Sequence, residues 1–97
     1  MKAMIWNMRT WITETNPDRL QHIFDEMIAA AGFHVLGKLE HYFQPQGYTK
    51  IYLLAESHFA IHTFPEEGKT YIELSSCNEQ YQKRFEALFA QYVKDRD

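Results

Sequence analysis

Short strand-like runs dominate the chain. The first run, Met1–Thr15, mixes β-branched and aromatic residues with polar ones in rough alternation, which suits a pleated strand better than a helix. Four further runs of this kind are Phe33–Gln44, with an expected bend at Gly37, Tyr48–Ala55, His58–Phe64 and Thr70–Ser76. Turn residues at Pro45–Gly47 and at Pro65–Gly68 predict that the strands on either side of each turn pair antiparallel.

Two stretches have helical spacing instead. Asn16 followed by Pro17 and Asp18 is typical of a helix start, and Gly32 can adopt the left-handed conformation that ends a helix. Between them the apolar positions fall on one helical face, at Leu20, Ile23, Phe24, Met27, Ile28 and Ala31. Glu79–Lys94 is the second amphipathic stretch. The element order β-α-β-β-β-β-α predicts an α+β fold, a two-layer sandwich with helices packed on one face of a mostly antiparallel β-sheet.

Length and composition limit the organisation. The chain has 97 residues, of which 45% are hydrophobic and 15% aromatic, so we expect a single globular domain over residues 1–97. The apolar area that such a chain buries barely offsets the conformational entropy it loses. We therefore expect a homodimer.

Charge and hydropathy exclude several partners. The net charge is −3 and no Lys/Arg cluster is present, which argues against nucleic acid, whose phosphates require positive charge on one face. No apolar run approaches the roughly 20 residues of a membrane span, and Met1–Arg9 lacks the apolar core of a signal peptide. The chain has one cysteine, which fits a reducing compartment. We expect a cytoplasmic protein.

Candidate chemistry gathers between residues 56 and 77, where Ser57, two histidines and the only cysteine, Cys77, occur. Alternation along a strand places His58 and His62 on one face and Ser57 on the other. Ser57 and His62 can therefore cooperate only if the backbone departs from a regular pleat at the junction of Glu56 and Ser57. The antiparallel return after Pro65–Gly68 brings Cys77 back toward the Glu56–His58 end of its partner strand, so the serine, the histidine and the cysteine could meet there.

The residue types alone leave several interpretations open. One is ordinary packing, since buried cysteines and strand histidines are common in cores. A metal site of His58, His62 and Cys77 is a second interpretation, but structural zinc normally takes four ligands at tighter spacing, so no metal is predicted. A third is a Cys77 thiol activated by His62, although the local sequence matches no known nucleophile turn.

A resemblance favours a fourth interpretation. The run LAESHFAIHTFPE at residues 54–66, with Gly68 and then Cys77, resembles the processing and active-site segment of bacterial S-adenosylmethionine decarboxylases. That family has a pattern close to SESHxxIHTWPExG, with a cysteine at this distance. The likeness covers residues 41–77 and includes His41, Phe43, Pro45 and Gly47.

The resemblance implies a cofactor that the chain makes from itself. In that family the serine attacks the preceding carbonyl, an ester forms, and elimination cuts the chain and leaves a pyruvoyl group. Carried over, the cut falls between Glu56 and Ser57, Ser57 becomes the pyruvoyl group, and His62 is the base that removes its α-proton. The pyruvoyl group then binds the substrate amine as a Schiff base and accepts the electrons released as carbon dioxide leaves.

The same resemblance assigns roles to other residues. Cys77 corresponds to the general acid that returns a proton to the α-carbon. Phe43 and Phe64 correspond to aromatic substrate contacts, with Phe43 stacked on the adenine. Glu66 corresponds to the carboxylate that holds the ribose hydroxyls, and Thr49 to a hydroxyl residue that supports processing. Aromatic faces also suit a sulfonium cation, and Phe43, Phe64, Tyr42 and Tyr48 are the aromatic residues expected near it.

The resemblance implies a small-molecule substrate, and the implied function is decarboxylation of S-adenosylmethionine for polyamine (spermidine) biosynthesis. The family usually has tryptophan at the position of Phe64 and tyrosine at that of Glu67. Extra carboxylates, with Glu67 and Glu73 as candidates, keep a basic amino acid such as ornithine or arginine as an alternative substrate. A non-catalytic regulatory relative is the other alternative.

Overall fold

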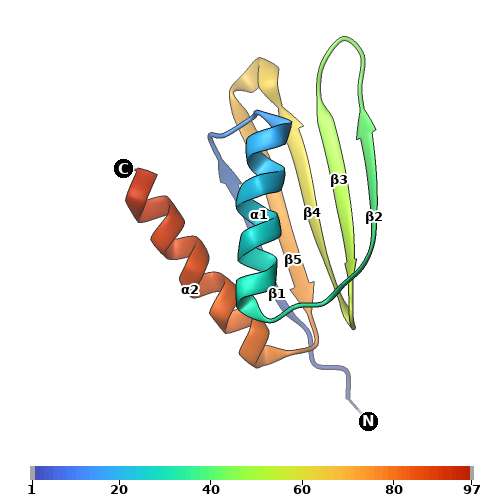
Figure 1. Ribbon diagram of the computed structural model, residues 1–97, viewed down its shortest axis with the longest axis vertical. Coiled ribbons are helices and arrows are strands. Elements are labelled where there is room, and N and C mark those ends of the chain that lie inside the picture. Colours follow the sequence, from blue (N-terminus) through green and yellow to red (C-terminus); the bar gives the residue numbers. More distant parts are fainter. Residues whose placement is uncertain (1, 97) are drawn as a thin grey trace.

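The computed structural model describes residues 2–96, so Met1 and Asp97, the two ends of the expected domain, lie outside the described residues. A five-stranded antiparallel sheet carries both helices on one side (Figure 1). In chain order the elements are β1 Trp6–Ile12, α1 Pro17–Ala31, β2 Val35–Tyr42, β3 Tyr48–Leu54, β4 Ser57–Phe64, the short 3₁₀ helix η1 Pro65–Glu67, β5 Lys69–Ser76 and α2 Glu79–Arg96. The α+β class and the element order predicted from the sequence are confirmed.

Strand β4 lies at the centre of the sheet. The spatial order is β1-β5-β4-β3-β2, and each neighbouring pair is antiparallel. The turn between β2 and β3 and the turn between β4 and β5 therefore each join antiparallel strands, as the sequence predicts. The pairing of β2 with β3 shifts between Val35 and Gly37, which confirms the bend expected at Gly37.

Local sequence explains where the helices begin and end. The side chain of Asn16 accepts a hydrogen bond from the backbone N–H of Arg19 at 3.0 Å, and Gly32 ends α1 with a φ of 105°. Asn78 caps α2 in the same way, because its Oδ1 accepts the N–H of Tyr81 at 2.9 Å. These caps satisfy backbone groups that have no partner inside the helix.

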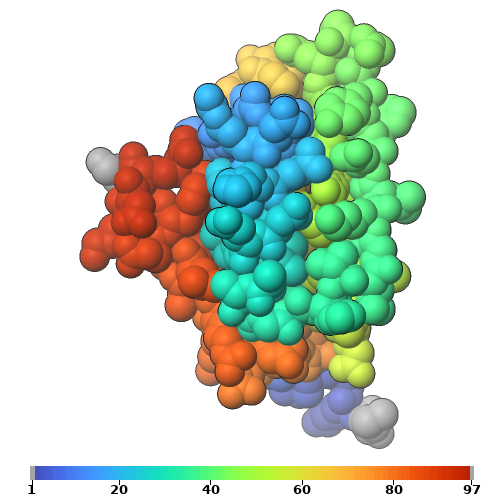
Figure 2. Space-filling model, in the orientation of Figure 1, coloured from blue at the N-terminus to red at the C-terminus, as the bar shows by residue number. Residues whose placement is uncertain are grey.

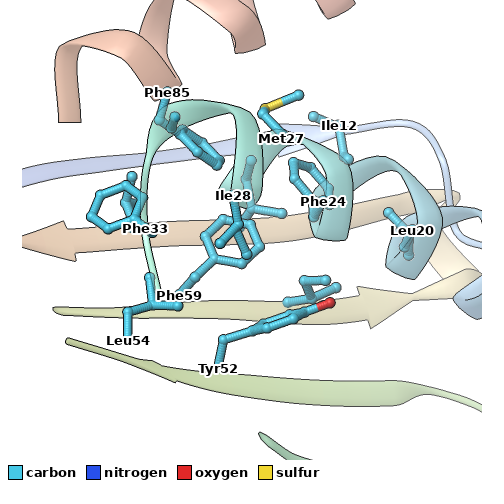
Figure 3. Close-up of a cluster of buried hydrophobic side chains, with 14 residues drawn as sticks. Ile12, Leu20, Phe24, Met27, Ile28, Phe33, Tyr52, Leu54, Phe59 and Phe85 are labelled. Atoms are coloured by element: carbon cyan, nitrogen blue, oxygen red, sulfur yellow. The ribbon is translucent and has the colours of Figure 1, made fainter. Parts of the chain in front are cut away.

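The hydrophobic core fills the space between the helices and one face of the sheet (Figure 3). Phe24 of α1 packs on Phe59 of β4 with ring centroids 4.9 Å apart, and Phe59 packs on Phe85 of α2 at 5.4 Å. Figure 2 shows α1 along the middle of this side, α2 beside it, and β2 uncovered beyond α1. The core therefore includes side chains from β3, β4 and β5 as well as from both helices.

The other face of the sheet has no helix on it. On β4 this open face carries His58, Ala60 and His62, because Phe59 and Ile61 point into the core. Three large apolar side chains on the open face are half or more exposed: Trp11 at 50%, Leu39 at 77% and Leu53 at 56%. Within residues 2–96, no helix combines the length and the apolar character that crossing a membrane requires.

Candidate active site

The junction of Glu56 and Ser57 lies in the tight turn between β3 and β4. Glu56 has a φ of 60°, in the left-handed region that costs a residue with a side chain about 1 kcal/mol. The predicted departure from a regular pleat is therefore found at Glu56. Ser57 itself follows the regular register of β4, opposite Leu54 on one side and Ser76 on the other.

The Ser57 hydroxyl is held on the helix-covered side of the sheet. Its side chain is buried, and its Oγ donates to Oγ of Ser76 at 2.9 Å. The Ser76 oxygen also accepts the backbone N–H of Asn78 at 2.9 Å. Sequence reasoning missed Ser76, although the antiparallel register across the Pro65–Gly68 turn places it directly opposite Ser57.

Cys77 lies at the same end of the sheet as Ser57. Both residues line a hollow of about 170 Å³, together with Glu56, His58 and Ser76. The Cys77 thiol is free and exposed, so it is accessible to a molecule that enters the hollow. The structure thus brings together two of the three residues expected to carry the chemistry.

A second hollow, of about 410 Å³, lies at the other end of β4. It gathers the remaining candidate residues, namely Phe43, Thr49, His62, Phe64 and Glu66. Oγ1 of Thr49 lies 3.0 Å from Nδ1 of His62, a hydrogen bond that fixes the orientation of the imidazole ring. Gln46 donates to the Glu66 carboxylate at 3.4 Å. The adenine, ribose and processing roles assigned by resemblance therefore fall on one surface.

Ser57, His62 and Cys77, which the sequence allows to meet, do not come together within one chain. Ser57 faces the helices and His62 faces the open side, and the five residue steps from one to the other correspond to about 16 Å of strand. The unbroken pairing of β4 with β5 from Ser57 to Phe64 is the physical reason. Nor do His58, His62 and Cys77 come together: residues 2–96 contain no group of three or more potential ligands placed to hold a metal ion.

Two of the aromatic residues expected near a sulfonium lie elsewhere. Tyr48 is buried on the helix side and its hydroxyl donates to Glu40, so burial and that carboxylate raise the pKa of Tyr48. Tyr42 packs on Tyr48, with ring centroids 4.7 Å apart. The rings that extend the His62 hollow along the open face are instead Tyr71, 6.2 Å from His62, and Trp11 beyond it.

The two carboxylates considered for a basic substrate also lie outside this hollow. Glu67 ends η1 and is exposed. Glu73 lies on the open face in the middle of β5, where its carboxylate accepts a hydrogen bond from Asn7 at 2.9 Å. Neither residue lines the hollow that contains His62 and Phe43.

Comparison with known proteins gives a consistent set of relatives. The family model described as S-adenosylmethionine decarboxylase matches residues 7–95. An S-adenosylmethionine decarboxylase proenzyme from Prochlorococcus marinus is 46% identical over 50 residues, which cover 52% of this chain and 40% of the relative. The proenzyme from Persephonella marina is 36% identical over 77 residues, covering 73% and 57%.

A solved structure has the same fold. The crystal structure of the adenosylmethionine decarboxylase from Aquifex aeolicus superimposes with a TM-score of 0.72 at 21% identity, over 91% of this chain and 78% of that one. The matched segments span about half of the length of these curated relatives. Since the family model covers nearly the whole described sequence, the chain belongs to the S-adenosylmethionine decarboxylase family, which includes these bacterial proenzymes.

Proposed function

We propose that the protein is a pyruvoyl-dependent decarboxylase of S-adenosylmethionine that first cuts its own chain between Glu56 and Ser57. One observation carries this proposal: the Ser57 hydroxyl is buried and hydrogen-bonded directly after the left-handed Glu56, with Cys77 in the same hollow. Relatives named as decarboxylase proenzymes support both the substrate and the self-processing.

The proposed cut uses atoms of Glu56 and Ser57. Oγ of Ser57 attacks the carbonyl carbon of Glu56, so an ester C–O bond forms while the peptide C–N bond breaks and the hydroxyl proton ends on the freed nitrogen. A base then removes the α-proton of Ser57, which expels the new Glu56 carboxylate and leaves a carbon–carbon double bond. Water replaces the nitrogen, which leaves as ammonia, and the remaining three-carbon unit is the pyruvoyl group.

The hollow around Ser57 fits such a group. It is open enough, at about 170 Å³, to admit the reacting part of an amino acid. When formed, the pyruvoyl group supplies a carbonyl electron sink for decarboxylation. Cys77 is the proposed general acid, because its exposed thiol lies at that hollow and can return a proton to the product's α-carbon.

The second hollow supplies the proposed binding site for the nucleoside. Phe43 and Phe64 offer two rings for the adenine and the sulfonium. Glu66 offers a carboxylate that can accept hydrogen bonds from two ribose hydroxyls. His62, oriented by Thr49, is the proposed base for elimination.

A homodimer completes the proposed site. The two hollows lie at opposite ends of β4, so a single chain does not hold Ser57 and His62 in reach of each other. In this dimer the open faces of the two sheets pack together around a two-fold axis, and the two β4 strands run antiparallel. The His62 end of one copy then lies at the Ser57 end of the other. The exposed Trp11, Leu39 and Leu53 support this face as the one that a second copy covers.

The alternatives receive less support. Ornithine or arginine would need a carboxylate in addition to Glu66 to bind the side-chain cation, and the two candidates, Glu67 and Glu73, both lie outside the hollow. A non-catalytic regulatory relative would have no need for the retained set of Ser57, His62 and Cys77. We place the enzyme in polyamine (spermidine) biosynthesis in the cytoplasm, where a single cysteine remains a thiol.

Release of carbon dioxide tests the proposal. The purified protein should release it from S-adenosylmethionine and not from ornithine or arginine at equal concentration. Release from a basic amino acid alone would overturn the substrate assignment. If a correctly cut chain releases no carbon dioxide from any of the three substrates, the result would favour the non-catalytic regulatory relative.

A further inference from the structure

Ser76 is a buried polar residue that makes direct contact with the proposed nucleophile. Only 1% of its surface is exposed, and it stands opposite Ser57 in the pairing of β4 with β5. The distance between the two hydroxyl oxygens is 2.9 Å. A hydroxyl at this depth is expected to have defined partners, because an unpaired buried polar group is costly.

The partners of Ser76 determine the direction of that hydrogen bond. Its oxygen accepts the N–H of Asn78 at 2.9 Å, and its own hydroxyl donates to the carbonyl of Asn78 at 3.3 Å. With its proton engaged there, Ser76 acts as acceptor toward Ser57. The hydrogen of the Ser57 hydroxyl therefore points to Ser76, and the remaining lone pairs of its oxygen are left free.

Asn78 makes this arrangement rigid. It caps α2 through the N–H of Tyr81, and α2 packs on the core through Phe85. The orientation of Ser57 is thus tied, through Ser76, to the start of a helix rather than to a mobile loop. Positioning of this kind raises the rate of an intramolecular attack, because it removes the entropy of finding the reactive geometry.

We infer that Ser76 is a positioning residue for the first step of self-cleavage. This inference rests on the proposed function, and it concerns only the attack of Oγ of Ser57 on the carbonyl of Glu56. Ser76 holds the Ser57 hydroxyl in place so that a free lone pair of the Ser57 oxygen can form the ester bond. It takes no part in the later elimination, where His62 is the proposed base.

A matched pair of variants tests the inference. Valine and threonine have nearly the same shape, so Ser76→Val and Ser76→Thr differ at position 76 only in the hydroxyl. After cell-free synthesis of each chain, electrophoresis follows the loss of full-length protein with time. Ser76→Thr should cut at close to the wild-type rate and Ser76→Val at least about tenfold more slowly, the scale of one lost hydrogen bond.

The control removes another buried hydroxyl from the same face of the same strand. Thr70 is fully buried on β5, and its hydroxyl donates to the backbone carbonyl of Glu14 at 2.6 Å, at the end of the strand away from Ser76. Thr70→Val should lower stability and leave the rate of cutting unchanged. Each variant is also made in a Ser57→Ala chain, which cannot be cut, so that thermal unfolding shows whether the variant folds. If the larger valine side chain prevents folding, Ser76→Ala replaces Ser76→Val.

Hydroxylamine separates a positioning role from a later defect. It cleaves esters, so it should release fragments from a chain that has formed the ester and stalled, as expected of His62→Ala. A folded Ser76→Val chain should yield few such fragments, because its ester forms slowly and does not accumulate. Cutting of folded Ser76→Val or Ser76→Ala at the wild-type rate, or abundant ester in the slow variant, would overturn the inference. A wild-type chain that remains uncut would instead contradict the proposed function, on which the inference depends.

Discussion

Ser57 and His62 lie on one strand, β4, but on opposite faces of the sheet and near its opposite ends. Ser57 shares its end with Ser76 and Cys77, and His62 shares the other with Thr49 and Glu66. The regular pairing of β4 with both neighbours makes it unfavourable for these side chains to approach within one chain. In the homodimer that we propose, a partner copy supplies the half of the site that one copy lacks.

Mixing two inactive variants should restore cutting. Ser57→Ala retains His62, and His62→Ala retains Ser57, so a mixed dimer contains one complete pair. After co-expression of the two differently tagged chains, mass spectrometry should find the His62→Ala chain cut after Glu56 and the Ser57→Ala chain whole.

Each variant expressed alone is the control and should remain largely uncut. If co-expression leaves both chains whole although a mixed dimer is isolated through the two tags, the shared site is wrong. If the His62→Ala variant is cut efficiently when expressed alone, His62 is not the base in self-cleavage.

Replacing Cys77 should separate cutting from decarboxylation. Cys77→Ala retains Ser57, Ser76 and the turn at Glu56, so we expect it to form the pyruvoyl group. Loss of a positioned general acid typically lowers a rate by about 10² to 10⁴-fold. Carbon dioxide release per cut chain is the measurement, and an unchanged rate would exclude Cys77 as the acid.

The aromatic contacts beneath the helices should dominate stability. Phe59 is fully buried between Phe24 and Phe85, and truncating a buried phenylalanine to alanine typically costs about 3 to 5 kcal/mol. Denaturant unfolding of Phe59→Ala, made in a Ser57→Ala chain to prevent cutting, should show that loss. Leu36→Ala is the matched surface control, because Leu36 is 60% exposed on edge strand β2, and it should change stability by no more than about 0.5 kcal/mol.

Alkaline pH should destabilise the fold through Tyr52. Burial and the hydrogen bond to Asp25 raise the pKa of Tyr52 above the ordinary value of 10.0. Below that value the phenol is protonated in both the folded and unfolded chains, so its stabilising effect is fully present. As pH rises further, only the unfolded chain loses the proton, and the free energy of unfolding should fall by about 1.4 kcal/mol per pH unit for this residue.

Tyr52→Phe isolates this effect. Between about pH 10.5 and 11.5 its unfolding free energy should fall less steeply than that of the parent chain, by the slope of one proton. The contribution of Lys50 to the free energy of unfolding depends on pH in the opposite direction. Burial lowers the pKa of Lys50 from 10.5, so this contribution rises with pH only up to that value. Parallel slopes for the two chains would show that the Tyr52 phenol ionises freely in the fold.

Local patterns predicted the elements well, because they depend on nearby residues. The cap at Asn16, the stop at Gly32 and the turn at Pro65–Gly68 each follow from short-range chemistry, and the structure confirms them. The fold class follows from their order.

The assembly of the site depends on pairings that no local pattern contains. The pairing of Ser57 with Ser76 keeps Ser57 in the regular pleat of β4, whereas the sequence left open an irregular backbone that would bring Ser57 closer to His62. The burial of Tyr48 on the helix side likewise follows from the register of β3, which one residue of slip would reverse.

Mass spectrometry of the intact purified protein tests the central claim most directly. Self-cleavage at Glu56–Ser57 predicts two fragments, one covering residues 1–56 and the other beginning at position 57 with a ketone in place of a free amine. Ser57→Ala, purified in parallel, should give only the full-length mass. A wild-type sample that contains folded, full-length chain alone, or a second fragment that begins with an unmodified serine, would contradict the account.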